Sequence, residues 1–283
     1  MFIMHDSKAK EKAGKIVLHL FLIAGSLIML FPFFWALSVS LQGPGLAYVT
    51  PPRFFGPPYF FENYMTAIKE ANMLHYCLNS LLISLICVIG AVLSNTFIGF
   101  GFAQYNFKGS QLLFLTVLGT MMLPNNITTI AHYVIWRTFG ALDTYVPLTL
   151  PSFFGGAMLI FLCRQHFLSI PKDLYAAALM DGANPLRIFF QVYLPISKVI
   201  IATIAVQTFQ GSWNNMFQSL IYLTTRSKYT IAIGLLYLQG TFEANNLEIL
   251  MAASVIAMLP MIIVYFFAQK QFVAGMVSGA VKG

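Results

Sequence analysis

Residues 78–103 read LNSLLISLICVIGAVLSNTFIGFGFA, without one charged side chain. A helix needs about 20 predominantly apolar residues to cross a bilayer. Because hydrocarbon offers no hydrogen-bond partners, the spanning segments of a membrane protein are helices or the strands of a closed barrel. The stretch is far longer than a barrel strand, which has about ten residues of alternating polarity. It therefore predicts a transmembrane helix.

Five further apolar stretches lie on either side of this one. Together they predict an all-α, polytopic membrane protein with about six transmembrane helices, at residues 16–40, 78–103, 112–130, 145–163, 199–222 and 249–268. The composition agrees with this class, because 58% of the 283 residues are hydrophobic and only 9% are charged. A soluble domain has about 25% charged residues. The chain has too few charges to cover a surface that faces water on all sides.

Basic residues are distributed unequally between the connecting segments. With the N-terminus in the cytoplasm, the inner segments hold 11 basic and 4 acidic residues, and the outer segments hold 5 of each. Cytoplasmic loops of membrane proteins are enriched in Lys and Arg, so this bias predicts that both termini are cytoplasmic. The net charge of +7 is therefore explained by topology and by contact with the lipid bilayer. It does not indicate binding of nucleic acid.

This topology divides the chain into five segments. They are a cytoplasmic N-terminal segment (1–15), a first transmembrane helix (16–40), an extracytoplasmic loop (41–77), a core of five helices (78–270) and a cytoplasmic C-terminal tail (271–283). Within the core, the connection 224–247 is also expected outside. Four lysines precede the first helix, whose apolar run is long and lacks a small-residue cleavage site. This pattern favours a retained helix over a cleaved signal peptide.

The predicted spans contain few ionisable or reactive side chains. No Asp, Glu, Lys or Arg lies well inside a span, whereas ion-coupled carriers place ionisable groups near the middle of the membrane. The three cysteines have neither metal-ligand spacing nor a disulfide pattern, and the chain has no Gly-rich phosphate-binding loop. We predict no catalytic residue, metal site or cofactor on this chain, and we expect the energy source on another subunit.

Neutral amides recur at helical spacing in the predicted span 199–222. They are Gln207, Gln210, Asn214 and Gln218, with Trp213 beside them. Spacings of three and four residues place the amides on one helical face. Asn and Gln form hydrogen bonds between membrane helices, so this face is either polar contact between helices or one wall of a substrate pathway. Amides donate and accept hydrogen bonds, as sugar hydroxyls require, and on the second interpretation these residues line the pathway.

Residues 171–183, PKDLYAAALMDGA, form an ordered segment between two predicted spans. Asp173 suits the first turn of a helix, and the alanines at 176–178 favour a helix with a low-profile surface. Gly182 can adopt the left-handed conformation that ends a helix, and Asn184-Pro185 is a typical start of the next one. We predict two short helices joined by a sharp turn, either as a simple elbow at the membrane surface or as a docking surface.

The segment around Asp181-Gly182-Ala183, twelve residues before Pro195, resembles the cytoplasmic coupling loop of permease subunits in bacterial binding-protein-dependent ABC importers. Further matches place the chain near the carbohydrate branch of that family. They are Asn63-Tyr64, Asn79-Ser80, Pro124, Arg164-Gln165, Trp213-Asn214, Tyr229-Thr230 with Gly234, Met251-Ala-Ala253, Pro260, Gln269 and residues 275–283. One departure is Ala176, where the family usually has Glu.

The resemblance implies a permease subunit of a maltose-type carbohydrate importer in the bacterial inner membrane. Implied partners are a second permease, a dimer of ATPase subunits that bind ATP and Mg²⁺, and an extracytoplasmic sugar-binding protein. The loop, about 171–195, would couple to the ATPase through Asp173, Ala176, Ala177, Asp181, Gly182 and Ala183. The alternative is a stand-alone carrier or channel for a neutral polar solute. A membrane enzyme is a weaker alternative, since no cluster of His, Asp or Cys suggests catalysis.

Overall fold

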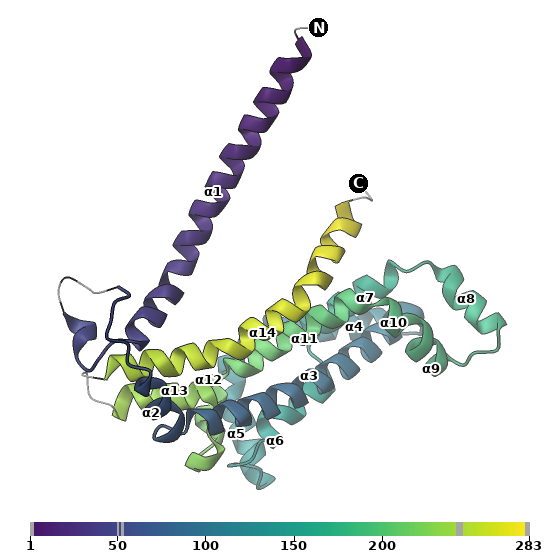
Figure 1. Ribbon diagram of the computed structural model, residues 1–283. Helices are drawn as coiled ribbons and strands as arrows, with labels where there is room; N and C mark the ends of the chain where they lie inside the picture. The colour runs from purple at the N-terminus through teal and green to yellow at the C-terminus, as the bar shows by residue number, and fades with distance from the viewer. Residues whose placement is uncertain (1–2, 50, 52–53, 242–245, 281–283) are drawn as a thin grey trace. The chain divides into compact units, whose positions relative to one another are not determined.

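The computed structural model describes all residues except 1–2, 50, 52–53, 242–245 and 281–283, and the described part is helical without a β-strand (Figure 1). Parts of four predicted segments therefore lie outside the described residues: 1–15, 41–77, 271–283 and the connection 224–247. The elements are α1 (Ile3–Ser40), η1 (Leu46–Tyr48), α2 (Glu62–Lys69), α3 (Met73–Gln104), α4 (Ser110–Gly119), η2 (Thr120–Met122), α5 (Asn125–Thr138), α6 (Val146–Thr149), η3 (Leu150–Phe154), α7 (Ala157–Leu168), α8 (Lys172–Met180), α9 (Pro185–Ile188), η4 (Phe189–Tyr193), α10 (Leu194–Ile196), α11 (Lys198–Trp213), α12 (Met216–Tyr222), η5 (Arg226–Lys228), α13 (Ile231–Thr241) and α14 (Leu247–Ala280).

The chain forms two compact units. Unit 1 comprises Met1–Ala71 and Leu238–Ile256, and unit 2 comprises Asn72–Tyr237 and Ala257–Gly283. In unit 1, α1 is long and apolar enough to cross a membrane from Gly14 to Ser40, as predicted for residues 16–40. The end of α1 is held by α2, because Asn63 Nδ2 donates to the carbonyl oxygens of Ser40 (2.9 Å) and Gln42 (2.8 Å).

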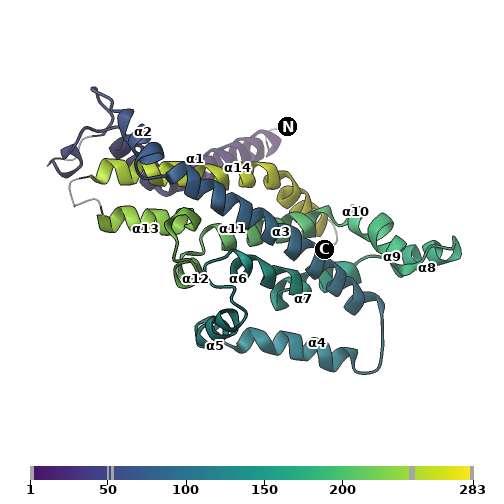
Figure 2. The same ribbon diagram turned by 90° about the horizontal axis from the view of Figure 1, so that it is seen from below.

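Helix α3 is the central element of unit 2 and packs against α7 and α11 (Figures 1 and 2). Two glycines allow close contact. A Cβ at Gly99 would lie 2.4 Å from Cys163 Cβ, and one at Gly90 would lie 2.7 Å from the ring of Phe153. Small residues at helix crossings are typical of membrane bundles. The stretch 78–103 is helical as predicted, and α3 begins five residues earlier, at Met73. The helix is long and apolar enough to cross a membrane.

The predicted span 145–163 is interrupted. The chain forms α6 and η3, leaves helical structure at Gly155-Gly156 and continues as α7. Proline has no N–H to donate, and Pro147 and Pro151 both lie in this stretch. Side chains of α3 satisfy the freed backbone groups, because Ser94 Oγ donates to Ser152 O (2.9 Å) and Gly156 N donates to Asn95 Oδ1 (2.7 Å). The stretch Val146–Leu168 is still long and apolar enough to span a membrane.

Two other predicted spans are not straight helices. The segment predicted at 112–130 is a pair, Ser110–Met122 and Ile127–Thr138, bent by 103° next to Pro124. The segment predicted at 199–222 is divided at Asn214-Asn215, and α11 is itself bent by 81° from Pro185–Ile196. The segment predicted at 249–268 lies within Leu247–Lys270, which is long and apolar enough to cross a membrane. Among the described residues, four stretches meet this criterion, or up to six if each bent pair crosses once.

Two α-helices in the described part of the chain were not predicted: α2, inside the segment 41–77 that we expected to be a loop, and α13. Residues Ile231–Thr241 form α13 inside the connection 224–247, which we expected to be a loop. Ile231, Ile233 and Leu238 are each at most 3% exposed. The helix is too short to span a bilayer, so the sequence pattern for a transmembrane segment does not detect it.

Candidate functional site

The elbow, residues 172–188, consists of α8, a turn and α9. Helix α8 ends as predicted, because Gly182 has φ +76° and Ala183 N donates to Ala178 O (3.0 Å). Asn184 then caps α9, with its Oδ1 accepting a hydrogen bond from Arg187 N (2.8 Å), and Pro185 occupies the first helical position. The predicted pair of short helices with a sharp turn is confirmed. In both views α8 and α9 lie at one end of unit 2, away from α12 (Figures 1 and 2).

Most residues of the elbow are exposed. Of the predicted coupling residues, Ala183 is half-buried, and the exposed ones are Asp173, Ala176, Ala177, Asp181 and Gly182. The elbow also exposes large apolar side chains, namely Leu174, Leu179, Met180 and Leu186, with Met180 88% exposed. Contiguous exposed apolar surface is typical of sites that contact another protein or a membrane. The sequence analysis did not single out these four residues, because spacings of five, one and six residues show no helical period.

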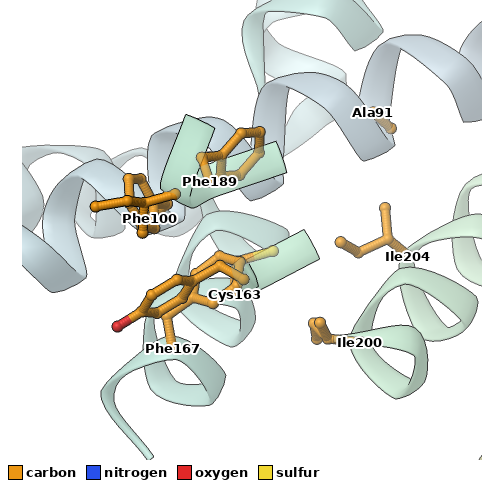
Figure 3. Packing of buried hydrophobic residues seen from close by; sticks show 9 residues of the cluster. Ala91, Phe100, Cys163, Phe167, Phe189, Ile200 and Ile204 are labelled. Atoms are coloured by element: carbon orange, nitrogen blue, oxygen red, sulfur yellow. The ribbon is translucent and has the colours of Figure 1, made fainter. Parts of the chain in front are cut away.

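The inner face of the elbow is fixed by the aromatic cluster, which consists of Phe100, Phe167, Phe189 and Tyr193 with the aliphatic residues around them (Figure 3). The ring centroids of Phe100 lie 5.0 Å from Tyr193 and 5.3 Å from Phe189. From the elbow, Tyr175, Ala178 and Ala183 pack against this cluster. Figure 3 also shows Ile200 and Ile204 of α11, which belong to the same buried group as these rings. The cluster therefore connects the elbow to α3, α7 and α11.

A polar contact accompanies the packing of Tyr175. Its hydroxyl lies 3.3 Å from the hydroxyl of Tyr105, which directly follows α3. Burial, followed by this hydrogen bond, raises the pKa of Tyr105 to about 12. The phenol of Tyr105 therefore stays neutral at physiological pH.

The chain bends between the elbow and α11. Residues 189–193 are π-helical, and Ser197 at the bend donates its hydroxyl to Tyr193 O (2.6 Å). His166 Nε2 of α7 lies 3.0 Å from the same hydroxyl. A π-helical turn and an interrupted helix are sites where helices kink. The bend thus separates the short helices of the elbow from the long helix α11, which carries the predicted pathway residues.

The predicted pathway residues do not share one helical face. Gln207 and Gln210 are exposed on α11, and Asn214 is exposed at its C-cap. Trp213 is 3% exposed and donates through Nε1 to Ala257 O (3.2 Å). Gln218 lies on α12, past the break, so the prediction of one continuous polar face is wrong.

The break has a local cause in Asn215. Its Oδ1 accepts a hydrogen bond from Gln218 N (3.2 Å), and its Nδ2 donates to Gln218 Oε1 (2.8 Å). Asn is favoured at helix N-caps and disfavoured in helix interiors. Two successive asparagines therefore end α11 and start α12.

Beside this break, a pocket of about 320 Å³ opens in unit 2. Its lining residues come from five parts of the chain: Ile83, Cys87, His132, Trp136, Pro147, Leu148, Pro151, Ser152, Thr208, Gly211, Ser212, Asn215, Gln218, Ser219 and Tyr222. Of the predicted pathway residues only Gln218 belongs to it. Sequence reasoning missed His132 and Trp136, because nothing in the pattern of residues 125–138 shows that they fold against α12.

Two loops of unit 2 are joined by a polar network, here called the staple: Asp143, Thr224, Thr225 and Lys228. Asp143 has φ +55°, and its Oδ1 accepts hydrogen bonds from the backbone N–H groups of Thr224 and Thr225, both at 2.9 Å. Its Oδ2 accepts from Thr225 Oγ1 (2.6 Å) and pairs with Lys228 Nζ (3.0 Å). The hydrogen bonds from Thr225 and Thr224, and then Lys228, hold the pKa of Asp143 well below its usual range.

The staple is connected to the pocket. Asp143 N donates to Tyr222 O (2.8 Å), and Tyr222 lines the pocket. Tyr222 also belongs to a buried group with Leu148 and Leu223, against which Trp136 packs. The staple therefore holds one wall of the pocket in position.

Sequence relatives cover nearly the whole chain. The arabinooligosaccharides transport system permease protein AraQ of Bacillus subtilis is 32% identical over 276 residues, covering 95% of this chain and 96% of AraQ. The maltodextrin transport system permease protein MdxG of the same organism is 28% identical, covering 98% of this chain and 100% of MdxG.

The fold is also found in a solved structure. A chain in the crystal structure of a bacterial ABC transporter involved in the import of the acidic polysaccharide alginate superposes with a TM-score of 0.80. The two sequences are 22% identical, and the likeness covers 92% of this chain and 97% of that one. Residues 11–278 match the family described as binding-protein-dependent transport system inner membrane component. The chain therefore belongs to this family of membrane transport proteins and is a transporter subunit rather than an enzyme.

Proposed function

We propose that this chain is one of two permease subunits in a bacterial ATP-driven carbohydrate importer, coupled to a cytoplasmic ATPase dimer through the elbow. The names of the relatives support a carbohydrate as substrate, since they transport arabinooligosaccharides, galactooligosaccharides and maltodextrins. A second permease would complete the pathway, and an extracytoplasmic binding protein would deliver the sugar. ATP and Mg²⁺ would bind to the ATPase. Family membership gives no support to the alternative of a stand-alone carrier or channel.

The observation that carries this proposal is the two-sided elbow. Its outer surface exposes Leu174, Leu179 and Met180, while its inner side packs on the aromatic cluster. A partner that grips the outer surface therefore acts on α3, α7 and α11 through direct packing. Allosteric coupling requires an element whose two arrangements are biased by binding, and the bend at Ser197 next to π-helical residues supplies a place where such a change can occur.

A substitution at Gly182 tests the coupling. Gly182→Val places a β-branched residue at φ +76°, which is strongly disfavoured. Nothing lies within 4 Å of the added Cβ, so backbone strain is the main expected effect. We expect normal membrane levels, weakened pull-down of the ATPase and loss of uptake in reconstituted vesicles.

Gly140→Val is the matched control, because Gly140 also has positive φ (+65°) and open space around it but lies outside the elbow. If Gly182→Val transports sugar and stimulates the ATPase normally, the elbow has no coupling role. If both variants fail equally, the defect comes from strain in general.

The orientation is tested by labelling. We propose that the elbow faces the cytoplasm and that the loop 223–230 faces outward, as the distribution of basic residues predicts. In a background without native cysteines, Ser227→Cys should react with an impermeant thiol reagent in intact protoplasts, and Ala177→Cys should react only after lysis. Both residues are exposed. The reverse pattern would invert the topology and remove the elbow from the ATPase.

A further inference from the structure

The pocket lies where the backbone of unit 2 departs from a continuous helix. Thr208, Gly211 and Ser212 reach it from the last turns of α11, and Asn215 and Gln218 reach it from the start of α12. In membrane proteins, non-helical backbone is tolerated where it lines a cavity or is buried in protein. In secondary transporters, substrate sites are often formed by such discontinuous helices.

The lining mixes apolar side chains with uncharged polar ones. Hydroxyls come from Ser152, Thr208, Ser212, Ser219 and Tyr222. None of the lining residues is Asp, Glu, Lys or Arg, and His132 contributes an imidazole. Ionic ligands would require opposite charge in such a site. The pocket therefore suits a neutral ligand that both donates and accepts hydrogen bonds.

One hydroxyl in this lining has an unused bonding capacity. Thr208 Oγ1 is buried, and the structure shows no hydrogen-bond partner for it. Buried polar groups in proteins are nearly always paired with protein, water or ligand. By contrast, Thr203 on the same helix donates its hydroxyl to Val199 O (2.9 Å). Thr208 is thus a lining residue whose buried hydroxyl has no hydrogen-bond partner in the structure.

The size of the pocket and its aromatic surface indicate which neutral ligand fits it. The volume of about 320 Å³ is at the lower end of the roughly 300–1,000 Å³ that ligand pockets have, which suits a small ligand such as one sugar ring. Trp136 and Tyr222 add aromatic surface to the hydroxyls and amides. Such rings combine an apolar face with a polar edge, which matches a ring that carries C–H groups and hydroxyls.

We propose that this pocket binds one neutral, polyhydroxylated sugar ring of the transported carbohydrate, with Thr208 and Gln218 as hydrogen-bond partners and Trp136 as an aromatic wall. The inference rests on the proposed function and assigns part of sugar selectivity to this permease. The ring is bound beside the break between α11 and α12. Because Tyr222 is tied to the staple, displacement of the 223–230 loop would change the shape of the site.

Substitutions of two threonines on α11 test the site. In the complete importer, reconstituted with its ATPase, second permease and binding protein, Thr208→Val removes the unpartnered hydroxyl without loss of an internal hydrogen bond. Loss of one neutral hydrogen bond corresponds to about a 2- to 12-fold rise in the half-saturating sugar concentration for uptake. Thr208→Ser should behave as wild type, and so should the control Thr203→Val, which lies outside the pocket. Equal uptake by Thr208→Val and Thr203→Val would overturn the proposal.

A binding readout separates a sugar from trapped water. Thr208→Cys, with the native cysteines replaced, is reacted with a methanethiosulfonate reagent in the presence of L-arabinose, D-galactose, D-glucose or their trisaccharides. We expect a transported sugar to slow the reaction of the cysteine at position 208 with the reagent. Mannitol at the same osmolarity is the control and should leave the reaction rate unchanged. No protection by a sugar that the wild-type importer transports means that the pocket holds only water, and the proposal fails.

The same experiments distinguish a failure of the proposed importer function from a failure of the pocket assignment. If the wild-type importer neither couples to the ATPase nor takes up any sugar of the panel, the carbohydrate importer itself is wrong. If it transports and couples but the Thr208 variants show no selective effect, only the pocket assignment is wrong.

Discussion

The elbow and the staple hold loops of the same unit by opposite means. At the elbow, Tyr175, Ala178 and Ala183 are held by contact with aromatic rings. At the staple, Asp143 alone accepts hydrogen bonds from Thr224, Thr225 and Lys228. Aromatic packing is spread over many weak contacts, whereas the staple depends on a few directional bonds around one carboxylate.

The two kinds of contact permit different amounts of movement. Rings that pack edge to face can shift against one another without losing one decisive contact, whereas charge-assisted hydrogen bonds hold only within a narrow range of distances and angles. We therefore expect the elbow to move with its partner and the staple to keep Tyr222 and the pocket wall in place. The predictions below test the two attachments, from the largest expected effect to the smallest.

Removal of the central ring should have the largest effect. Phe100 is 3% exposed, and its ring centroid lies 5.0 to 6.3 Å from those of Tyr105, Phe167, Tyr175, Phe189 and Tyr193. Truncation of a buried Phe to Ala costs about 3–5 kcal/mol, so Phe100→Ala should lower the thermal transition of the detergent-purified importer and uncouple ATP hydrolysis from uptake. Phe107→Ala is the control, because Phe107 is 46% exposed. A fully coupled Phe100→Ala importer would show that the elbow acts without the cluster.

Loss of the staple carboxylate should have a smaller effect. Asp143→Ala removes every side-chain acceptor and places Ala at φ +55°. We expect a loss of about 1–2 kcal/mol, below the full value of charge-assisted bonds because water reaches this carboxylate. The rate of limited proteolysis within the loop 223–230 measures this loss of stability. Asp143→Asn keeps one oxygen acceptor and tolerates left-handed backbone, so it should lie between Ala and wild type. If the wild type and both Asp143 variants are equally protected from proteolysis, other contacts hold the loop.

The two attachments should fail at opposite extremes of pH. Asp143 has a lowered pKa in the folded protein, so its contribution is present above the unfolded value of about 3.9 and is lost as pH falls toward the folded value. Tyr105 has a raised pKa of about 12, so its contribution is complete below about 10 and is lost as pH rises toward 12. Proteolysis between pH 5 and 9 should therefore be constant at both places. An acid-sensitive elbow or an alkali-sensitive staple would contradict this assignment.

The smallest effect is expected from the residue that departs from the family pattern. Ala176 is exposed on α8, and Glu is a good helix former, so Ala176→Glu should preserve membrane level and uptake. Ala178→Glu is the matched control on the same helix, because Ala178 packs against the aromatic cluster and would bring a carboxylate among aromatic rings. Loss of uptake by Ala176→Glu at normal membrane levels would show that the exposed face of α8 fits its partner closely.

Local features of the sequence were sufficient to predict the class of the protein and the form of the elbow. Long uncharged stretches required membrane helices, and α1, α3 and α14 lie where they were predicted. Gly182 and Asn184 specified the end of one short helix and the start of the next, since capping depends on the nearest few residues. The staple was not predicted, because the charge of Asp143 says nothing about which loop it will meet.

The breaks and the pocket depended on tertiary structure. Pro124 and Asn214-Asn215 were visible in the sequence, but whether a membrane helix bends or is divided at such residues depends on which neighbouring groups satisfy the freed backbone, as Asn95 does for Gly156. The pocket needs Trp136 from α5, Pro151 from η3 and Gln218 from α12 in one place. Hydrophobic periodicity determines which segments enter the membrane, whereas side-chain packing between distant segments decides what faces the space between them.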